Sequence, residues 1–433
     1  MVQLESDTVR VTNRARAARA ATTQRRGRFA TVWDSPLTSY YMLVGATTML
    51  LVLGLVMVLS SSSVDALAEG KSVYSKFLDQ GLFVLIGLLP MLAATRIKLT
   101  FYLRFAWVLL FASFALQLLI FTPLARGKGG NMNWVAIGGS FTIQPSEFMK
   151  LALAVWLGFI MFRKNDLLHD WRHAVIPAIP VIAVALGLVM GGHDLGTAGV
   201  MILLAAGAHF VAGIPMRIFA VAAGGLGAFA VWYLAGSDNR MNRVKAWLGH
   251  ADIADPQELA YQTKHGLWGL GTGGFTGVGL GAGRQKWSYL PEAHNDFIFA
   301  VIGEELGLVG TVAVLMLFAV LGIAMVRVIR RHPHPMVKVT TAAIACWIIG
   351  QALINIGVVI GLLPVIGVPL PLVSAGGSAL LATMLALGIV IHFAREEPGA
   401  PELLKARPSL VRRSVAVVAH TVRNRANRPN QES

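Results

Sequence analysis

The stretch of the sequence richest in candidate chemistry is Y-L-P-E-A-H-N-D-F-I-F-A-V-I-G-E-E-L-G-L-V-G, residues 289–310. It places Glu292, His294 and Asp296 just before a long apolar run. Carboxylates at or below a membrane surface cost free energy, so they are functional candidates by default. A positioned carboxylate can also accept a proton from a reacting hydroxyl group.

Asp296 has a simpler alternative explanation, because Asn and Asp are also good residues at the start of a helix. On the bare sequence, capping of the following helix is the favoured interpretation. Glu304 and Glu305 lie within the apolar run. In a continuous helix Glu304 would lie roughly 12 Å deeper than Asp296, and Glu305 would face the opposite side. We therefore expect no close carboxylate pair with Asp296.

A second candidate group is Q-P-S-E-F-M-K, residues 144–150. Pro145 and Glu147 suit the first turn of a helix, which is the structural alternative. Glu147 and Lys150 are also three residues apart and share one helix face, so they can pair. At the outer rim of a bundle such a pair would line a polar cavity, and the lysine would suit an anionic substrate.

The long polar stretch 237–296 contains clustered cations, which suggest a phosphate or pyrophosphate ligand. The same stretch carries acidic residues, so an ordinary solvated loop is the slightly favoured alternative. Within it, the glycine-rich run 269–286 would allow backbone amides to approach phosphate. A flexible or tightly packed hairpin is the alternative and the favoured one. The cations are Arg240, Arg243, Lys245, Lys264, Arg284 and Lys286.

Three further polar features belong to the predicted helices. Asp194 is expected to cap the helix that begins after it. Gln351 and Asn355 lie four residues apart and are expected to make interhelical hydrogen bonds. The run Pro364–Ser378 breaks the helical pattern with Pro and Gly. Irregular backbone at this depth is tolerated beside protein or a water-filled cavity, so it is expected to be re-entrant or to form a cavity wall.

The elements that must position these residues are membrane helices. The chain has 433 residues, of which 55% are hydrophobic and 14% charged. This composition excludes an ordinary soluble protein. The apolar runs predict an all-α polytopic membrane protein with about ten transmembrane helices of roughly 20 residues each. They fall near 39–60, 75–95, 105–122, 144–162, 174–191, 195–213, 217–236, 296–325, 337–361 and 378–394.

The distribution of basic residues orients these helices. The net charge is +15, and both tails and the connections 96–104, 163–173 and 326–336 are basic. The positive-inside rule places them, and hence both termini, in the cytoplasm. The loops 123–143, 237–296 and 362–377 are then on the outer side. The large outer loop between helices 7 and 8 is expected to be functional because of its length.

Three domains are predicted: a basic, disordered cytoplasmic tail over 1–36, the ten-helix domain over 37–395, and a second such tail over 396–433. Basic tails beside membrane spans indicate contact with membrane lipids, and no nucleic acid is expected as a partner. Cys346 is the single cysteine. No internal disulfide and no cysteine-based metal site are therefore expected.

Taken together, these motifs resemble the SEDS family (shape, elongation, division and sporulation), most closely its cell-division members, with the elongation members second. The resemblance covers about 39–395. It is carried by Q-P-S-E-F-M-K at 144–150, D-L-G-T-A at 194–198, G-L-G-A-G-R-Q-K at 279–286, L-P-E-A-H-N-D-F-I-F-A-V-I-G-E-E-L-G at 290–307 and N-I-G-V-V-I-G-L-L-P-V-I-G-V-P-L-P-L-V-S-A-G-G-S at 355–378.

The resemblance implies a peptidoglycan glycosyltransferase that polymerises lipid II at the outer face of the bacterial cytoplasmic membrane, at the division septum. It implies Asp296 as the catalytic base. Two positions depart from the family pattern, Asn133 where many relatives have Arg and Ala375 where many have Tyr. Substrate-binding candidates are the residues that match its polar motifs or carry the outer charges: Glu147, Lys150, Arg240, Arg243, Lys286, His294 and Ser374.

The implied partners are a class B penicillin-binding protein transpeptidase and other divisome proteins. A divalent cation, Mg²⁺ or Mn²⁺, is the only cofactor considered, because charge builds on the departing pyrophosphate. The sequence assigns no ligands to it. Two alternative functions stay open, a lipid II flippase and a non-catalytic divisome scaffold. A flippase would need polar groups through the full depth of the membrane.

Overall fold

The computed structural model describes residues 33–68, 70–128, 131–138, 141–168, 170–236, 241, 244–245, 247–248, 259–287, 290 and 293–406. The chain divides into two units, one of which is Ser39–Phe393 and contains the helical bundle. The other consists of residues from the two chain ends and includes α15, Ala400–Ala406. Most of the two predicted tails lies outside the described residues.

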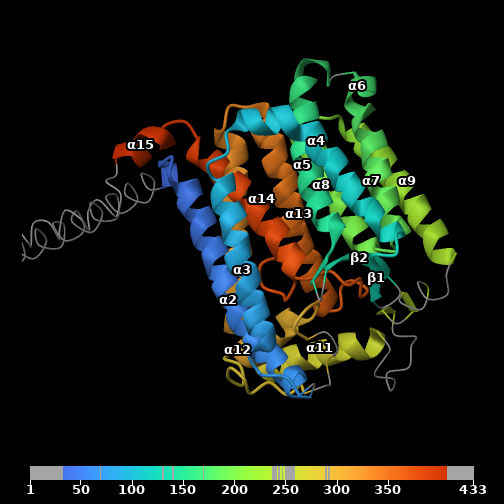
Figure 1. Cartoon of the computed structure of the whole chain (residues 1–433), viewed down its shortest axis with the longest axis vertical. Helices are drawn as coiled ribbons and strands as arrows, with labels where there is room; N and C mark the ends of the chain where they lie inside the picture. Colours follow the sequence, from blue (N-terminus) through green and yellow to red (C-terminus); the bar gives the residue numbers. More distant parts are fainter. Residues whose placement is uncertain are drawn as a thin grey trace, which may run out of the picture. The chain divides into compact units, whose positions relative to one another are not determined.

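The described residues of the bundle are mainly helical, as predicted (Figure 1). Ten helices correspond to the ten apolar runs. Seven are long and apolar enough to cross a membrane, and three, α7, α8 and α9, are shorter apolar helices. The ten are α2 (Thr38–Ala68), α3 (Ser75–Ala94), α4 (Leu99–Leu118), α5 (Pro145–Arg163), α7 (Ala178–Gly191), α8 (Leu195–Val211), α9 (Met216–Ala235), α12 (Ile298–Arg331), α13 (Pro335–Val359) and α14 (Gly377–Arg395).

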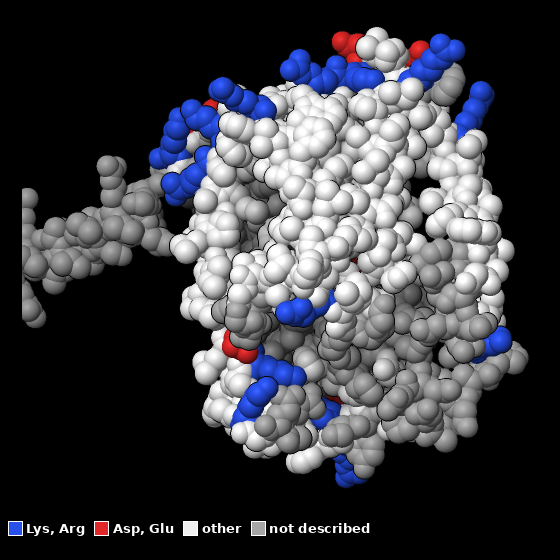
Figure 2. Space-filling view, turned by 45° about the vertical axis from the view of Figure 1, so that its right-hand side comes forward, with Lys and Arg blue, Asp and Glu red and all other residues white. Residues whose placement is uncertain are grey.

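Charge distinguishes the two ends of this bundle. The short helix α6 (Trp171–Val175) lies at one end, and the strands and α11 (Leu259–Gly273) lie at the other (Figure 1). Basic side chains gather over the α6 end (Figure 2). They include the exposed side chains of Arg96, Lys98, Arg163 and Arg172. The positive-inside rule assigns this end to the cytoplasm and the α11 end to the outer side.

A small antiparallel sheet replaces part of the predicted outer loop 123–143, so the fold is not strictly all-α. It comprises β1 (Ala125–Lys128), β2 (Asn131–Gly138) and β3 (Phe141–Ile143) in the order β1-β2-β3. Arg126 pairs with Trp134 across β1 and β2. The amide of Met132 donates to the carbonyl of Gly192 at 3.0 Å, which attaches the sheet to the turn before α8.

Helix α13 packs against both α5 and α8, and glycines allow the close approach. A Cβ at Gly158 of α5 would overlap Thr340 of α13, and a Cβ at Gly207 of α8 would overlap Cys346 of α13. Small residues let membrane helices approach closely, where van der Waals packing replaces the hydrophobic effect as the driving force. Helix α13 therefore holds Gln351 and Asn355 in fixed positions beside its neighbours.

Helix α12 is interrupted at Gly307, whose backbone has φ 66° and ψ −160°. The glycine-rich loop after α11 joins the helix at this break. The amides of Val278 and Gly279 donate to the carbonyls of Glu304 and Glu305, both at 3.0 Å. The amides of Leu308 and Val309, which would otherwise bond those carbonyls, donate to the carbonyls of Gly274 and Phe275 at 3.0 and 3.2 Å. All four groups are therefore satisfied, as burial near a membrane requires.

This arrangement explains the glycines of the loop by packing. A Cβ at Gly277 would overlap the backbone of Glu305, and a Cβ at Gly307 would overlap Gly277 and Phe275. Both glycines also have positive φ, which disfavours other residues. Of the flexible and tightly packed forms that the sequence left open, the structure supports the tightly packed one.

This packing gives a matched pair of tests. Gly277 and Gly281 share φ +81°, but a Cβ at Gly281 would meet open space. We expect Gly277→Ala to lower the stability of the protein by about 3 kcal/mol, because overlap adds to backbone strain. Gly281→Ala should lower the stability by only about 1 kcal/mol, which is the cost of backbone strain at positive φ without overlap. Thermal melting of the purified protein measures both, and equal losses would contradict the packing explanation.

Candidate functional site

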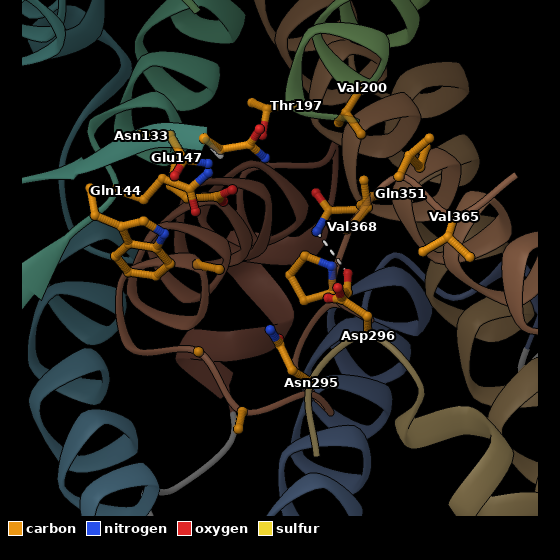
Figure 3. A pocket seen from close by; sticks show the side chains of 18 of the residues that line it. Asn133, Gln144, Glu147, Thr197, Val200, Asn295, Asp296, Gln351, Val365 and Val368 are labelled. Carbon is orange, nitrogen blue, oxygen red and sulfur yellow. Dashed lines mark hydrogen bonds between the residues drawn. The ribbon is translucent and has the colours of Figure 1, made fainter. Parts of the chain in front are cut away.

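A cavity of about 310 Å³ lies at the α11 end of the bundle, on the side that the charge distribution assigns to the outside. Its wall combines segments that are far apart in the sequence (Figure 3). They are β2, the first turns of α5 and α8, α11, the segment before α12, α13 and the irregular run after it. Among the described residues that line it are Asn131, Asn133, Trp134, Gln144, Glu147, Lys150, Thr197, Gln262, Asn295, Asp296, Gln351 and Val365–Pro369.

Asp296 lies in the wall of this cavity, one residue before the N-cap position of α12. Helix α12 begins at Ile298, and its N-cap position is Phe297, which makes no side-chain capping bond. The predicted position of Asn295 and Asp296 at the N-cap or in the first turn of the helix is therefore wrong. The carboxylate of Asp296 is partly buried and faces the same cavity as Glu147, Lys150 and Gln351.

Side chains hold the backbone around Asp296 in place. Asn355 donates through its Nδ2 to the carbonyls of Asp296 and Val368, both at 2.8 Å. Ser374 donates through its hydroxyl to the carbonyl of Asn295 at 2.6 Å and accepts from the amide of Leu370 at 2.8 Å. The irregular backbone of the two segments is thus satisfied by side chains, and Asp296 is fixed relative to the cavity wall.

Glu147 and Lys150 form a buried ion pair at the cavity, as their spacing predicted. Lys150 Nζ lies 2.8 Å from Glu147 Oε1 and 2.9 Å from Gln351 Oε1, and 4.8 Å from the ring centre of Trp347. Gln351 Oε1 also accepts from Trp347 Nε1 at 3.0 Å, and its Nε2 donates to the carbonyl of Pro369 at 2.9 Å. The predicted interhelical bonds of Gln351 are confirmed, because Lys150 belongs to α5 and Gln351 to α13.

The charges of this cavity are unevenly matched. Lys150 is the only cation among the described lining residues, and Glu147 neutralises it. The second carboxylate oxygen of Glu147, Oε2, is buried and has no hydrogen-bond partner within the described part of the chain. A buried oxygen of this kind is costly unless a donor or a cation reaches it. Within the described lining, Glu147 Oε2 is therefore an acceptor that a donor or a cation could occupy.

Asp194 ties the sheet to the start of α8. It caps α8, as predicted, by accepting from the amide of Thr197 at 2.9 Å. Its other oxygen accepts from Asn133 at 3.0 Å, from Gln144 at 2.9 Å and from the hydroxyl of Thr197 at 2.8 Å. Asn133, at the position that departs from the family pattern, thereby connects β2 to the helix that carries Thr197 into the cavity.

Two predicted residues, His294 and Ser374, support the cavity from behind its lining. The carbonyl of His294 accepts from the amide of Ala375 at 3.0 Å. Its Nε2 lies 3.2 Å from Nζ of Lys76, at the start of α3. Ser374 bonds the backbone next to Asp296, as described above. The structure brings these two residues to the site without placing them among its lining residues.

Lys286 lies in a different buried cluster. Its Nζ is 2.7 Å from Glu305 Oε1 and 3.2 Å from the hydroxyl of Ser60 on α2, and it does not line the cavity. Glu304 accepts from the amides of Arg284 and Gln285 at 2.7 and 3.2 Å, so this carboxylate occupies amides that a phosphate could otherwise approach. Arg240 and Arg243 lie outside the described residues.

Sequence reasoning missed two carboxamides of the cavity, Asn131 and Gln262, and did not assign Gln144 to a ligand site. Asn131, Gln144 and Gln262 line it together with the aromatic ring of Trp134. Amides carry no charge, so composition and charge patterns do not single them out. The strand that carries Asn131 and Trp134 has a recognisable signal, since Gly129-Gly130 and Gly139-Ser140 separate three short segments in the way typical of hairpins.

Fold and site together define a multi-pass α-helical membrane protein with a carboxylate-containing polar cavity near one membrane face. The family of cell cycle proteins that comprises FtsW, RodA and SpoVE matches residues 41–398. The chain belongs to this family, and the resemblance inferred from its motifs is confirmed.

Individual relatives agree with this assignment. The chain is 36% identical over 382 residues to the probable peptidoglycan glycosyltransferase FtsW of Mycobacterium tuberculosis, covering 88% of this chain and 72% of the relative. It is 34% identical over 356 residues to the stage V sporulation protein E of Bacillus subtilis, covering 82% of this chain and 96% of the relative.

Solved structures share the fold. A chain from a peptidoglycan synthase complex aligns with a TM-score of 0.67 at 25% identity. The rod shape determining protein RodA of Thermus thermophilus aligns with a TM-score of 0.61, also at 25% identity. Each alignment covers 82% of this chain and 97% of the other.

The buried ion pair of the cavity generates a stability test. We expect Glu147→Gln to lower the stability by about 3 kcal/mol, because it leaves the charge of Lys150 buried without a counter-ion. The double variant Glu147→Gln/Lys150→Met should melt closer to the wild type, since it removes both charges together. Melting temperatures of the three purified proteins measure this. A double variant that is less stable than Glu147→Gln would contradict the account.

Proposed function

We propose that this protein is a peptidoglycan glycosyltransferase that polymerises lipid II into glycan strands at the outer face of the bacterial cytoplasmic membrane. The observation that carries the proposal is the position of Asp296. Its carboxylate lines a polar cavity on the outer side of the bundle, while Asn355 and Ser374 fix the backbone beside it. Membership of a family whose relatives are named for this activity supports the same conclusion.

In this reaction a sugar hydroxyl of one lipid-linked glycan attacks the anomeric carbon of a second lipid-linked glycan. The new bond joins that oxygen to the anomeric carbon, the bond from this carbon to the lipid pyrophosphate breaks, and the hydroxyl proton goes to the Asp296 carboxylate. A base contributes only if it is within hydrogen-bond reach of the hydroxyl. This requirement explains the hydrogen bonds from Asn355 and Ser374 that fix the backbone at Asp296 and Asn295. The amides and Trp134 of the wall suit sugar hydroxyls, acetamido groups and ring faces.

The departing pyrophosphate needs positive charge, and the described lining supplies only the neutralised Lys150. We therefore retain a divalent cation, Mg²⁺ or Mn²⁺, as part of the proposal. No group of three His, Cys, Asp or Glu side chains suited to a metal is present among the described residues. Mg²⁺ is commonly bound by one or two carboxylates together with substrate phosphates. Glu147, whose buried Oε2 has no hydrogen-bond partner among the described residues, would hold the ion, and the ion would stabilise charge on the leaving group.

The proposed partner is a class B penicillin-binding protein transpeptidase, with other divisome proteins and membrane lipids around it at the division septum. Support comes from two sides. A structurally similar chain belongs to a peptidoglycan synthase complex that coordinates polymerization and crosslinking. The relatives named FtsW belong to a family described as cell cycle proteins.

Polymerisation fits the cavity better than the alternative of a lipid II flippase. The lining residues of the cavity belong to the outer ends of α5, α8 and α13 and to the segments beyond them. Transport would need such groups to continue toward the cytoplasmic ends. A scaffold without activity would leave unexplained why two side chains fix the backbone around a cavity-facing carboxylate.

The proposal predicts that Asp296→Asn abolishes glycan synthesis, with a loss of about 100-fold or more, because the amide cannot accept the proton. The assay follows glycan strands made from lipid II by the purified protein with its transpeptidase partner, with and without Mg²⁺ or Mn²⁺. Asp79→Asn is a matched control, since Asp79 is an exposed carboxylate at the outer end of α3 outside the cavity lining.

Melting curves separate loss of the base from loss of the fold. We expect both variants to melt like the wild type, and the Asp79→Asn protein to retain its activity. Full polymerase activity of a folded Asp296→Asn protein would disprove the role of Asp296. Unchanged activity after removal of divalent metal would disprove the proposed requirement for a divalent cation.

A further inference from the structure

The loop that directly follows α11 exposes large apolar side chains. We call residues 274–281 the apolar loop. The exposed fractions are 71% for Phe275, 46% for Val278 and 58% for Leu280. The other residues of the loop are glycines and a threonine, so these large apolar groups make up most of its side-chain surface. Exposed clusters of this kind mark contact surfaces.

The exposure does not come from a loosely held segment. The four backbone hydrogen bonds at the break in α12 involve Gly274, Phe275, Val278 and Gly279. The amide of Gly277 adds a fifth bond, to the carbonyl of Gly273 at 2.8 Å. The backbone of the apolar loop is thus attached on both sides, and its apolar side chains are held outward. Because the loop is already ordered, little further conformational entropy is lost when another surface covers these side chains.

The apolar loop adjoins the exposed apolar side of a helix that is long and apolar enough to cross a membrane. Helix α12 is one of the membrane-spanning candidates, and its outward side chains Leu308 and Val309 are 51% and 54% exposed. These two residues are the ones whose amides bond the carbonyls of Gly274 and Phe275. Phe275 therefore lies directly beside the exposed apolar side chains of α12.

The residues around the apolar loop have the composition of a membrane interface. Trp268 and Trp287 are 47% and 59% exposed, and Lys264 Nζ lies 5.1 Å from the ring centre of Trp268. Arg284 follows the loop and is exposed. Trp with Lys or Arg at the headgroup level is the usual pattern where a membrane protein meets the lipid–water boundary.

We propose that the apolar loop inserts into the outer leaflet, with Phe275, Val278 and Leu280 at the boundary between headgroups and acyl chains. Its ligand is membrane lipid. The insertion anchors the outer end of α12 and the segment that leads back to Asp296, and it is independent of the reaction proposed above. Burial of these apolar side chains at the boundary stabilises the contact, because it removes apolar surface from water.

The test is a depth measurement on single-cysteine variants of the full chain in lipid nanodiscs. Cys346 is the only native cysteine, so Cys346→Ala provides the background. Phe275→Cys then carries an environment-sensitive fluorophore. The probes are lipids with a nitroxide near the headgroup, lipids with a nitroxide at the chain end, and iodide in the buffer. Melting curves confirm that each labelled protein is folded, and Val278→Cys reports on the same surface if the first variant is unstable.

Two matched positions calibrate the measurement. Val312→Cys lies one turn further along the exposed side of α12 and marks the lipid, and Asp170→Cys lies exposed at the α6 end and marks the aqueous phase. We expect the headgroup nitroxide to quench the label at position 275 at least about half as strongly as at position 312, since interfacial groups lie about 5–10 Å deep. Iodide should quench it far less than the label at position 170.

Strong iodide quenching at position 275 without lipid quenching would overturn the proposal, because the surface would then face water. Lipid quenching that disappears when the transpeptidase partner is added would also overturn it and assign the surface to a protein. Weak quenching by every probe would show that the side chain is buried within the protein, again against insertion. None of these results depends on glycan synthesis, so they leave the proposed activity to its own test.

Discussion

Asn355 connects the two irregular segments on which the site depends. Its side-chain amide donates to the carbonyls of Asp296 and Val368, which belong to chain segments about 70 residues apart with no helix of their own at these points. Backbone carbonyls near a membrane cannot be left without donors. One amide on a closely packed helix thus satisfies both carbonyls and sets the distance between the loop that carries the carboxylate and the loop that forms the opposite wall.

The break in α12 shows the same constraint on the other side of Asp296. A continuous helix would satisfy its own backbone, whereas the interruption at Gly307 needs partners from elsewhere. The loop 274–281 provides them, and glycine at positions 277 and 307 allows the backbones to approach closely. Glu304 and Glu305, within the apolar run, are used in the same construction, where they hold loop amides and Lys286. They are structural carboxylates, unlike Asp296.

Much of this could be predicted from the sequence, for reasons that individual residues make clear. Apolar runs locate the helices because the membrane imposes their length. The Glu147–Lys150 pair follows from spacing on one helix, and the cap at Asp194 from residue type. The interruption at Gly307 does not follow, since a single glycine inside an apolar run leaves the helical pattern intact. The position of Lys286 away from the cavity could not be predicted either, because it depends on an ion pair with Glu305, 19 residues further along the chain.

The central claim is that Asp296 acts in the chemical step and not in holding the substrate. The most direct test is the dissociation constant of lipid II for the wild type and for folded Asp296→Asn, measured under the conditions in which turnover is compared. A base that acts only in the transition state predicts an unchanged dissociation constant together with lost turnover. If binding weakens by the same factor as turnover, Asp296 holds the substrate and the account is wrong.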